Sequence, residues 1–292
     1  MKKAVITGAA GFAGYSTTIE LLNSGYEVYA VLRPNSEHNE RLSYHTDNIH
    51  LIELDCSDFG KIPMVVDSEC DVFIHLAWFG GRDDFSVQTD NIGYCLSALE
   101  SAAALKCKRF IGIGSQAEYG LCDSLISEDT KTAPINAYGA AKLAALYLSK
   151  RRAEQLGVEW IWGRIFSLYG DKEPSGRLFP DLINSLRTDR AINLSSCEQN
   201  WDYLNVKDGA KAIVALAEKG HPGEIYNIAN GDYRSLKSFV EEARDLLNSK
   251  SDIEYGPKAD PFVSLQPDVS KIYNHTGWKP DISFREGVLN FE

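Results

Sequence analysis

The sequence predicts a doubly wound α/β fold, in which helices cover both faces of a parallel sheet, with a smaller C-terminal α/β lobe. Three observations lead to this prediction. Short apolar strands alternate with longer helical patterns through the first half of the chain, a glycine-rich turn joins the first strand to the first helix, and the alternation loosens after about residue 168. Strands that are apolar throughout are buried on both faces, and strands that alternate with helices imply right-handed crossovers in a parallel sheet.

Six strands and three helices are expected in the first half of the chain. The strands cover residues 4–7, 27–32, 50–54, 71–77, 109–113 and 160–166. Each is a short apolar run, as in Val72-Phe73-Ile74, bounded by polar or turn residues. The helices cover residues 15–23, 85–105 and 137–156, and Gly25 closes the first of them.

The second half is expected to form a smaller lobe that closes a cleft over the carboxyl ends of the strands. Glycines and prolines between residues 170 and 180 interrupt the earlier pattern. Further helices are expected over residues 179–186, 206–218, 235–248 and 269–275. The chain therefore divides into residues 1–168 and residues 169–292, with some segments of the second part returning to the first.

The composition is that of a globular protein with an acidic surface. The 292 residues are 44% hydrophobic and 24% charged, which argues against disorder, collagen or a disulfide scaffold. With 30 Lys and Arg against 41 Asp and Glu, the net charge is −11. Such a chain repels phosphate backbones, so neither nucleic acid nor an anionic membrane is an expected partner.

The cysteines and the N-terminus favour a cytoplasmic protein. None of the six cysteines belongs to a C-x-x-C pair or lies at metal-ligand spacing from a histidine, so reduced thiols and no metal site are expected. The apolar run after Lys2 and Lys3 ends at Gly8, which is too short for a signal peptide or a membrane span.

The turn after the first strand has the glycines of a phosphate-binding loop. Gly8 allows a tight turn, Gly11 lets a pyrophosphate approach the backbone, and Gly14 lets the helix pack closely on the strand. The helix N-terminus then offers amide N–H groups and the positive end of its dipole. The spacing is G-x-x-G-x-x-G instead of the usual G-x-G-x-x-G, but its position directly after the first strand indicates a Rossmann-type dinucleotide site.

The end of the second strand indicates which dinucleotide is bound. Leu32 and Arg33 stand where an acid would accept hydrogen bonds from the adenosine ribose of NAD. A guanidinium pairs instead with a 2′-phosphate, so Arg33 favours NADP, with Ser36 as a further donor and NAD as the alternative. Asp55, after the third strand, is placed to accept from the adenine amino group, and it can equally cap the next turn.

A serine, a tyrosine and a lysine form the candidate catalytic set. Tyr138 and Lys142 stand at i and i+4 of a predicted helix and share one face. A phenol with an ordinary pKa of ~10 is a poor proton shuttle at neutral pH, and a nearby ammonium lowers that pKa. Lys142 can also hold the ribose of the cofactor. Ser115, at the end of the fifth strand, can orient a carbonyl or alcohol oxygen.

These motifs resemble those of the extended short-chain dehydrogenases/reductases, in particular the epimerase/dehydratase group that acts on nucleotide sugars. The resemblance covers nearly the whole chain. Besides the turn and the Ser-Tyr-Lys set, the segments that carry it are Phe73-Ile74-His75-Leu76-Ala77, Trp201-Asp202-Tyr203, Val206-Lys207-Asp208 and Gly277-Trp278-Lys279-Pro280.

The resemblance implies a role for each part of the chain. Residues 1–168 become an NAD(P)-binding domain and residues 169–292 a substrate-binding lobe. Ser115, Tyr138 and Lys142 become the catalytic residues. The residues implied around the cofactor, in addition to the three glycines, Tyr138 and Lys142, are Phe12, Ala13, Leu76, Ala77 and Asn91, the last of which keeps the site in shape.

Departures from the family pattern bear on the reaction and the substrate. Family 4,6-dehydratases follow the hydroxyl residue with an Asp-Glu pair that drives elimination of water, and here these positions hold Gln116 and Ala117. Ser167 stands in place of a common asparagine and Trp201 in place of the usual arginine, and both are candidate substrate-binding residues. Arg177 can supply charge to a diphosphate or be an ordinary surface cation.

The function predicted is an NADP-dependent reductase of a nucleotide-linked 4-keto-6-deoxy sugar. A nucleotide-sugar 4-epimerase with tightly bound NAD is the alternative, and a non-enzymatic dinucleotide sensor is the second alternative. Family members commonly dimerise through two long helices, so the resemblance also implies a homodimer through residues 85–105 and 137–156. The apolar residues that can serve either that interface or the core are Leu96, Leu99, Leu143 and Leu146.

Overall fold

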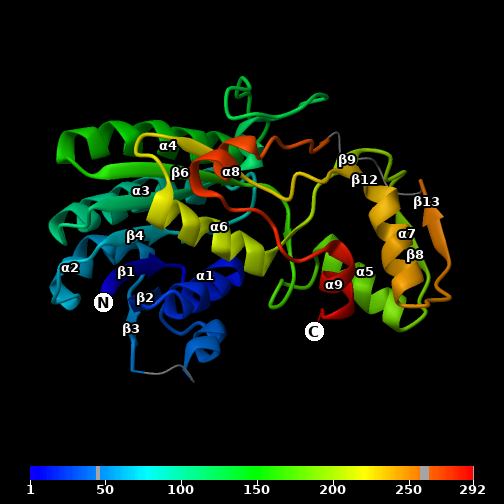
Figure 1. The fold of residues 1–292 in the computed structure, drawn as a ribbon, viewed down its shortest axis with the longest axis horizontal. Helices are drawn as coiled ribbons and strands as arrows, with labels where there is room; N and C mark the ends of the chain where they lie inside the picture. The colour runs from blue at the N-terminus through cyan, green and yellow to red at the C-terminus, as the bar shows by residue number, and fades with distance from the viewer. Residues whose placement is uncertain (44–46, 257–262, 292) are drawn as a thin grey trace.

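A seven-stranded sheet organises the larger part of the molecule (Figure 1). The computed structural model describes residues 1–43, 47–256 and 263–291. The strands lie in the order β11-β6-β5-β4-β1-β2-β3, and each neighbouring pair is parallel. Their bounds are β1 Lys2–Thr7, β2 Tyr26–Leu32, β3 Ile49–Glu53, β4 Val72–His75, β5 Arg109–Ser115, β6 Glu159–Ile165 and β11 Ile225–Ile228. The predicted doubly wound α/β fold is confirmed.

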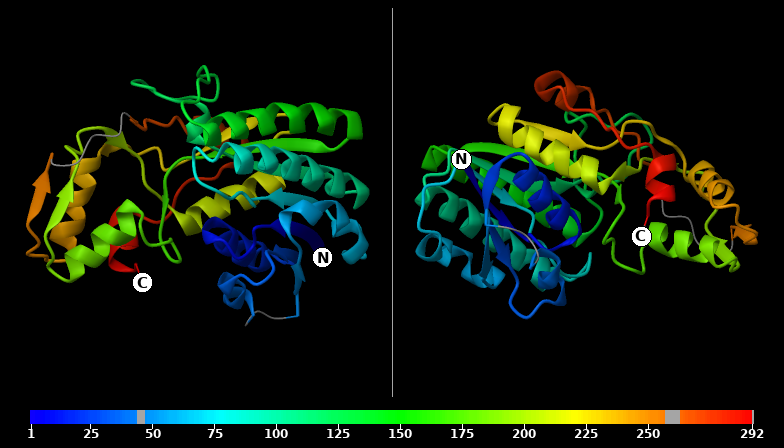
Figure 2. Two further views of the ribbon diagram at one scale, coloured as in Figure 1. Left: turned by 180° about the vertical axis from the view of Figure 1, so that it is seen from behind. Right: turned by 60° about the horizontal axis from the view of Figure 1, so that its bottom comes forward.

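Helices cover both faces of this sheet because successive strand residues point to opposite sides. Ala4 and Ile6 pack in one apolar cluster with α1 (Phe12–Asn23) and α6 (Val206–Lys219), whereas Val5 packs in a second cluster with α3 (Phe85–Ala104) and α4 (Ala137–Leu156). Figure 2 shows α3 (teal) and α4 (green) side by side. Over the described ranges, no helix is long and apolar enough to cross a bilayer.

A smaller lobe lies at one end of the molecule (Figure 1). It contains α5 (Leu178–Arg187), α7 (Leu236–Leu246), α9 (Phe284–Leu289) and the parallel pair β8 (Ile192–Leu194) and β13 (Ile253–Tyr255). Its core is an aromatic cluster of Tyr169, Phe179, Tyr203, Phe239 and Phe284. Two short pairs, β7 (Leu168–Tyr169) with β10 (Leu204–Asn205) and β9 (Asn200–Trp201) with β12 (Arg234–Ser235), complete the strands.

Several segments beyond residue 168 belong to the sheet and not to the lobe. Helix α6 packs on α1, β11 forms an edge of the sheet, and α8 (Ser270–Thr276) contributes Ile272 to the cluster on the α1 face. Strand β11 is not among the predicted strands. The short helices η1 (Glu37–Leu42), η2 (Cys56–Lys61), α2 (Ile62–Val65), η3 (Gln116–Glu118) and α9 were also not predicted.

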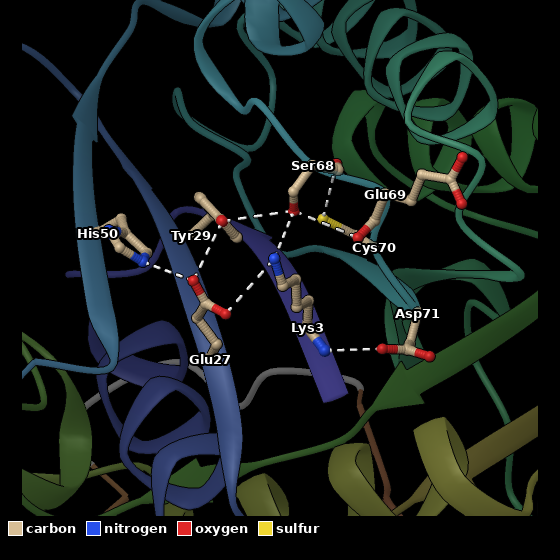
Figure 3. A network of polar contacts seen from close by, with 8 residues as sticks. All are labelled: Lys3, Glu27, Tyr29, His50, Ser68, Glu69, Cys70 and Asp71. Atoms are coloured by element: carbon tan, nitrogen blue, oxygen red, sulfur yellow. Dashed lines mark hydrogen bonds and ion pairs between the residues drawn. The ribbon is translucent and has the colours of Figure 1, made fainter. Parts of the chain in front are cut away.

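A polar network ties the amino ends of four neighbouring strands together (Figure 3). Glu27 of β2 accepts from His50 of β3 at 2.9 Å and lies 3.6 Å from the ammonium of Lys3 in β1. The backbone N of Lys3 donates to Asp71, just before β4, at 2.7 Å. The network lies at the amino edge, which is opposite the carboxyl edge where a doubly wound sheet is expected to hold its ligand crevice.

Candidate active site

The turn between β1 and α1 leaves no room for a side chain at Gly8 or at Gly14. Gly8 has a φ of +71°, and a Cβ there would lie 2.8 Å from the backbone nitrogen of Ala77. A Cβ on Gly14 would lie 1.9 Å from the carbonyl oxygen of Gly8. Gly11 begins α1 without a side-chain cap, and the first turn holds no acidic residue. The first amides of α1, Phe12 and Ala13 included, therefore suit a pyrophosphate.

The end of β4 is bound to the same turn. The backbone nitrogen of Leu76 donates to the carbonyl of Thr7 at 3.2 Å, and that of Ala77 donates to the Thr7 hydroxyl at 3.5 Å. These bonds place Leu76 and Ala77 where the strand order reverses, which is where doubly wound folds bind dinucleotides. Asn91, buried in α3, donates to the carbonyl of Phe79 at 2.9 Å and so holds the loop that follows β4.

The residues predicted for the adenosine end have mixed surroundings. Arg33 is exposed at the end of β2. Ser36 caps η1 by accepting from the backbone nitrogen of His38 at 3.4 Å. Asp55 caps η2 by accepting from the backbone nitrogen of Ser57 at 3.0 Å, which lowers the pKa of this carboxyl. Both side chains therefore have local partners. Sequence reasoning missed Arg41 of η1, which donates to the Ala10 carbonyl in the glycine turn at 3.1 Å.

Ser115 and Tyr138 meet at the carboxyl end of β5. Ser115 is the last residue of that strand and caps η3, where its Oγ accepts from the backbone nitrogen of Ala117 at 3.2 Å. Tyr138 is the second residue of α4, and its backbone nitrogen donates to the carbonyl of Arg82 at 2.8 Å. Burial raises the pKa of Tyr138, and a hydrogen bond with Ser115 opposes that rise.

Lys142 lies one helical turn after Tyr138, as the spacing predicts. It is 3% exposed, and its Nζ donates to the carbonyl of Ile113 at 2.6 Å. Nζ lies 5.9 Å from the centroid of the Tyr138 ring. Burial lowers the pKa of Lys142 to about 7, and electrostatic interactions with Cys95 and Glu118 oppose the change. The three predicted catalytic residues are thus brought together.

Glu118 is a component of this corner that the sequence analysis did not single out. It is fully buried, and its Oε1 accepts from the backbone nitrogen of Ser115 at 2.9 Å and from Trp162 Nε1 at 3.0 Å. Its Oε2 accepts from Arg164 Nε at 2.7 Å. The capping-box spacing of Ser115 and Glu118 was the available signal for this residue.

The predicted substrate residues lie on two segments of the second half. Ser167 and Trp201 are in contact, since Trp201 Nε1 donates to Ser167 Oγ at 3.1 Å. Arg177 is exposed immediately before α5. Burial is the largest effect on the pKa of Tyr138 and raises it. Electrostatic attraction from the guanidinium groups of Arg82 and Arg177 acts in the opposite direction and lowers it. Arg82, which sequence reasoning missed, and Arg177 therefore lie within electrostatic reach of the phenol.

No metal centre is evident at this site. In the described part of the chain, no group of three or more His, Cys, Asp or Glu side chains is placed to hold a metal ion. The donor set fits a dinucleotide instead, because the turn offers backbone amides and close approach, and the Ser-Tyr-Lys set offers two hydroxyl donors and one cation.

Comparison with known proteins identifies the class that this fold and site define. Residues 4–229 match the model of the NAD dependent epimerase/dehydratase family. The match spans most of the chain, and the chain therefore belongs to this family.

Individual relatives act on nucleotide sugars, according to their names. The chain is 28% identical to dTDP-6-deoxy-L-talose 4-dehydrogenase (NAD(+)) of Aggregatibacter actinomycetemcomitans, over 92% of this chain and 98% of that protein. It is 26% identical to CDP-abequose synthase of Salmonella muenchen, over 98% of this chain and 96% of that protein. The crystal structure of UDP-glucuronic acid 4-epimerase from Bacillus cereus with UDP-glucuronic acid and NAD has a TM-score of 0.85 at 24% identity, over 98% and 96% of the two chains.

Proposed function

We propose that this protein is an NAD(P)-dependent reductase of a nucleotide-linked 4-keto-6-deoxy sugar. The observation that carries the proposal is the meeting of Ser115, Tyr138 and Lys142 at a carboxyl edge that has Gln116 and Ala117 where dehydratases have acids. Glu118, the next carboxylate along the chain, is fully buried and bonded to three donors. It is therefore not available to protonate a leaving hydroxyl.

Each residue of the set has a defined part in a ketone reduction. When bound, a reduced nicotinamide supplies the hydride. The Ser115 hydroxyl donates a hydrogen bond to the ketone oxygen and fixes its direction. Tyr138 transfers its phenolic proton to that oxygen, so that the ketone becomes a secondary alcohol and the phenol a phenolate. The ammonium of Lys142 stabilises the phenolate and offers donors to the ribose of the cofactor.

Charge near the phenol supports a nucleotide-linked substrate. Arg82 lies in the loop between β4 and α3, and Arg177 lies immediately before α5, and both act electrostatically on the Tyr138 phenol. Two guanidinium groups suit a diphosphate. The bonded pair of Ser167, between β6 and β7, and Trp201, in β9 of the smaller lobe, supplies the surface for the sugar or nucleotide. The names of the two relatives above, a 4-dehydrogenase and a synthase of nucleotide-linked sugars, favour chemistry of this class.

The cofactor we propose is NADP. Exposed Arg33 follows β2 where an acid is absent, and Arg41 brings a second guanidinium against the glycine turn. NAD is the alternative, favoured by the name of the 4-dehydrogenase relative. Calorimetric titration compares the two directly. We expect tighter binding of NADPH than of NADH, and equal or weaker binding would contradict the assignment.

The function is tested with a panel of 4-keto sugar nucleotides. We expect loss of reduced-nicotinamide absorbance with at least one of them, and no loss with any of them would contradict the reductase.

The Tyr138→Phe variant is expected to lose about 10²–10⁴-fold in turnover because it lacks the proton donor, while it still binds the cofactor. Unchanged turnover in this variant would overturn the mechanism.

Two alternatives give different results in the same experiments. A 4-epimerase, the activity named for the Bacillus cereus structure, would release stoichiometric NAD when the purified protein is denatured. A dinucleotide sensor would bind cofactor without turnover, and a tuned phenol would have no purpose in it. The reductase draws on cellular NADPH, so we also propose a cytoplasmic protein, and the outer faces of α3 and α4 are the surface for a homodimer.

A further inference from the structure

The indole of Trp78 lies directly against the two ionisable residues of the proposed site. The Nζ of Lys142 is 3.8 Å from the centroid of the Trp78 ring. The same ring meets Tyr138 edge to face, with centroids 6.3 Å apart and planes at 87°. Trp78 follows Ala77 in the loop after β4, so it is one residue from the backbone that closes on the glycine turn.

The position of this indole is fixed by residues of α3. Trp78 Nε1 donates to Gln88 Oε1 at 2.8 Å. Gln88 is 1% exposed, and its amide donates to the carbonyls of Phe79 at 3.3 Å and Gly81 at 2.9 Å. Gly80, between them, has a φ of +91°, and a Cβ there would lie 2.4 Å from Val87. The loop is therefore held in one conformation that presents the face of the ring to Lys142.

The ammonium of Lys142 has few other partners. Its hydrogen bond goes to a neutral carbonyl, that of Ile113. Among the ion pairs of the described residues, none joins Lys142 to a carboxylate. An aromatic face within 6 Å attracts a cation most strongly when the cation is desolvated, and indole is the strongest of the aromatic side chains.

We propose that Trp78 is a positioning residue for Lys142: its anchored ring holds the side chain in place and stabilises the charged form that binds the dinucleotide. The inference rests on the proposed dinucleotide-binding function, but it does not depend on which sugar is reduced. It explains how a lysine at 3% exposure can keep a proton without a carboxylate in contact.

Other titratable groups face Lys142 and must be counted with Trp78. Cys95 of α3 and Glu118 of η3 favour the ammonium, whereas burial disfavours it and brings its pKa to about 7. Tyr138 faces it from α4, and His75 of β4 is near enough for the ammonium to help burial lower the pKa of that imidazole to about 3. Substitution of Trp78 removes none of these four groups.

The experiment measures NADPH affinity by calorimetry from about pH 6 to pH 10 in the wild type and in Trp78→Leu and Trp78→Phe. Loss of the π face is expected to move the alkaline decline of affinity down by about one pH unit in Trp78→Leu. Trp78→Phe, which keeps a weaker face and packs with less disturbance, should shift in the same direction by less. An unchanged profile in both variants, or a wild-type affinity that does not decline with pH, would overturn the proposal.

Lys142→Met provides the test of mechanism. If Trp78 acts through the ammonium, adding Trp78→Leu to Lys142→Met should cause no further pH-dependent change. An equal loss in both backgrounds would show simple packing and would also overturn the proposal. Trp160→Phe is the matched control, because Trp160 has Lys150 at 5.4 Å from its ring and an Nε1 bond to Ser149 but belongs to β6, outside the proposed site. Failure of the sugar panel with an intact pH effect would refute the reductase alone.

Discussion

At the scale of single residues, the proposed site buries an ammonium group, and the desolvation of that charge lowers the free energy of unfolding. Lys142 is 3% exposed, and burial lowers its pKa to about 7 from an ordinary 10.5. At pH values between about 7 and 10.5, Lys142 is protonated more often in the unfolded chain than in the folded chain. The free energy of unfolding therefore rises with pH across that window because of this residue, and the penalty is fully present below it.

Lys142→Met is therefore expected to stabilise the protein while removing its proposed function. A thioether chain of similar length fills the same space without a charge to desolvate. We expect a gain in the free energy of unfolding on the order of 2–4 kcal/mol near neutral pH, shrinking toward pH ~10. Urea unfolding at several pH values measures it. Lys150→Met on the same helix is the control, since Lys150 is less buried, and a gain that does not shrink with pH would contradict the argument.

At the scale of elements, the corner between β5 and η3 depends on one buried ion pair. Glu118 joins the backbone of Ser115 to Arg164 of β6, and the two side chains are 0% and 3% exposed. The guanidinium also lies 4.3 Å from the centroid of the Tyr119 ring. This arrangement fixes the strand end that carries the Ser115 hydroxyl.

Removing one partner of this pair should cost more than removing both. Glu118→Leu leaves the Arg164 guanidinium buried and uncompensated, so we expect a loss of about 3–5 kcal/mol in the free energy of unfolding. Adding Arg164→Met should restore much of that loss, because no buried charge remains. Denaturant unfolding of the two single variants and the double variant gives the coupling energy. Simple additivity of the single effects would show that the pair does not act as a unit.

Elements with local signals were predictable, and elements held by tertiary contacts were not. The runs that form β1, β2, β4, β5 and β6 are largely apolar, and most of their residues are buried, as the pattern indicates. The edge strand β3 departs from that expectation, because none of its five residues is buried and Leu51 is 44% exposed. Strand β11 has four residues and a buried asparagine, Asn227. Its side chain is satisfied by Tyr119 at 2.7 Å and by the carbonyl of Ile126 at 2.9 Å, which come from a loop about 100 residues earlier. Nothing near Asn227 in the sequence reports those partners.

The proposed site divides in the same way. The glycine turn and the spacing of Tyr138 and Lys142 are local patterns, and the structure brings them to one edge of the sheet. Trp78 and Arg82 approach that edge from the loop after β4, so their importance depends on how the loop is held by α3. Asp55 shows a different difficulty, because its place in the sequence is compatible with binding a ligand and with capping a helix. In the structure its carboxylate caps η2.

At the scale of the whole molecule, the outer surface of α3 and α4 determines the proposed association. Of the apolar residues considered for an interface, Leu99 and Leu146 are buried in the core between the helices and the sheet. Leu96 and Leu143 remain partly exposed. On α4, Tyr147 and Leu148 are 58% and 50% exposed. Both faces of this helix are thus apolar, which is why helical spacing alone could not separate core from interface.

Leu148→Glu should separate the proposed dimer into monomers. In a two-fold interface each substitution occurs twice, so two carboxylates would be brought into one apolar contact. Light scattering coupled to gel filtration is expected to give the mass of two chains for the wild type and one for the variant, while the variant still unfolds cooperatively on heating. Met64→Glu, on the 82% exposed side chain of α2, should leave the dimer intact. A monomeric wild type, or a variant that stays dimeric, would exclude this face as the interface.

Helix α4 also carries Tyr138 and Lys142, so loss of the dimer should lower cofactor affinity if the partner helps to hold that helix. Titration of the same samples with NADPH measures the change in affinity.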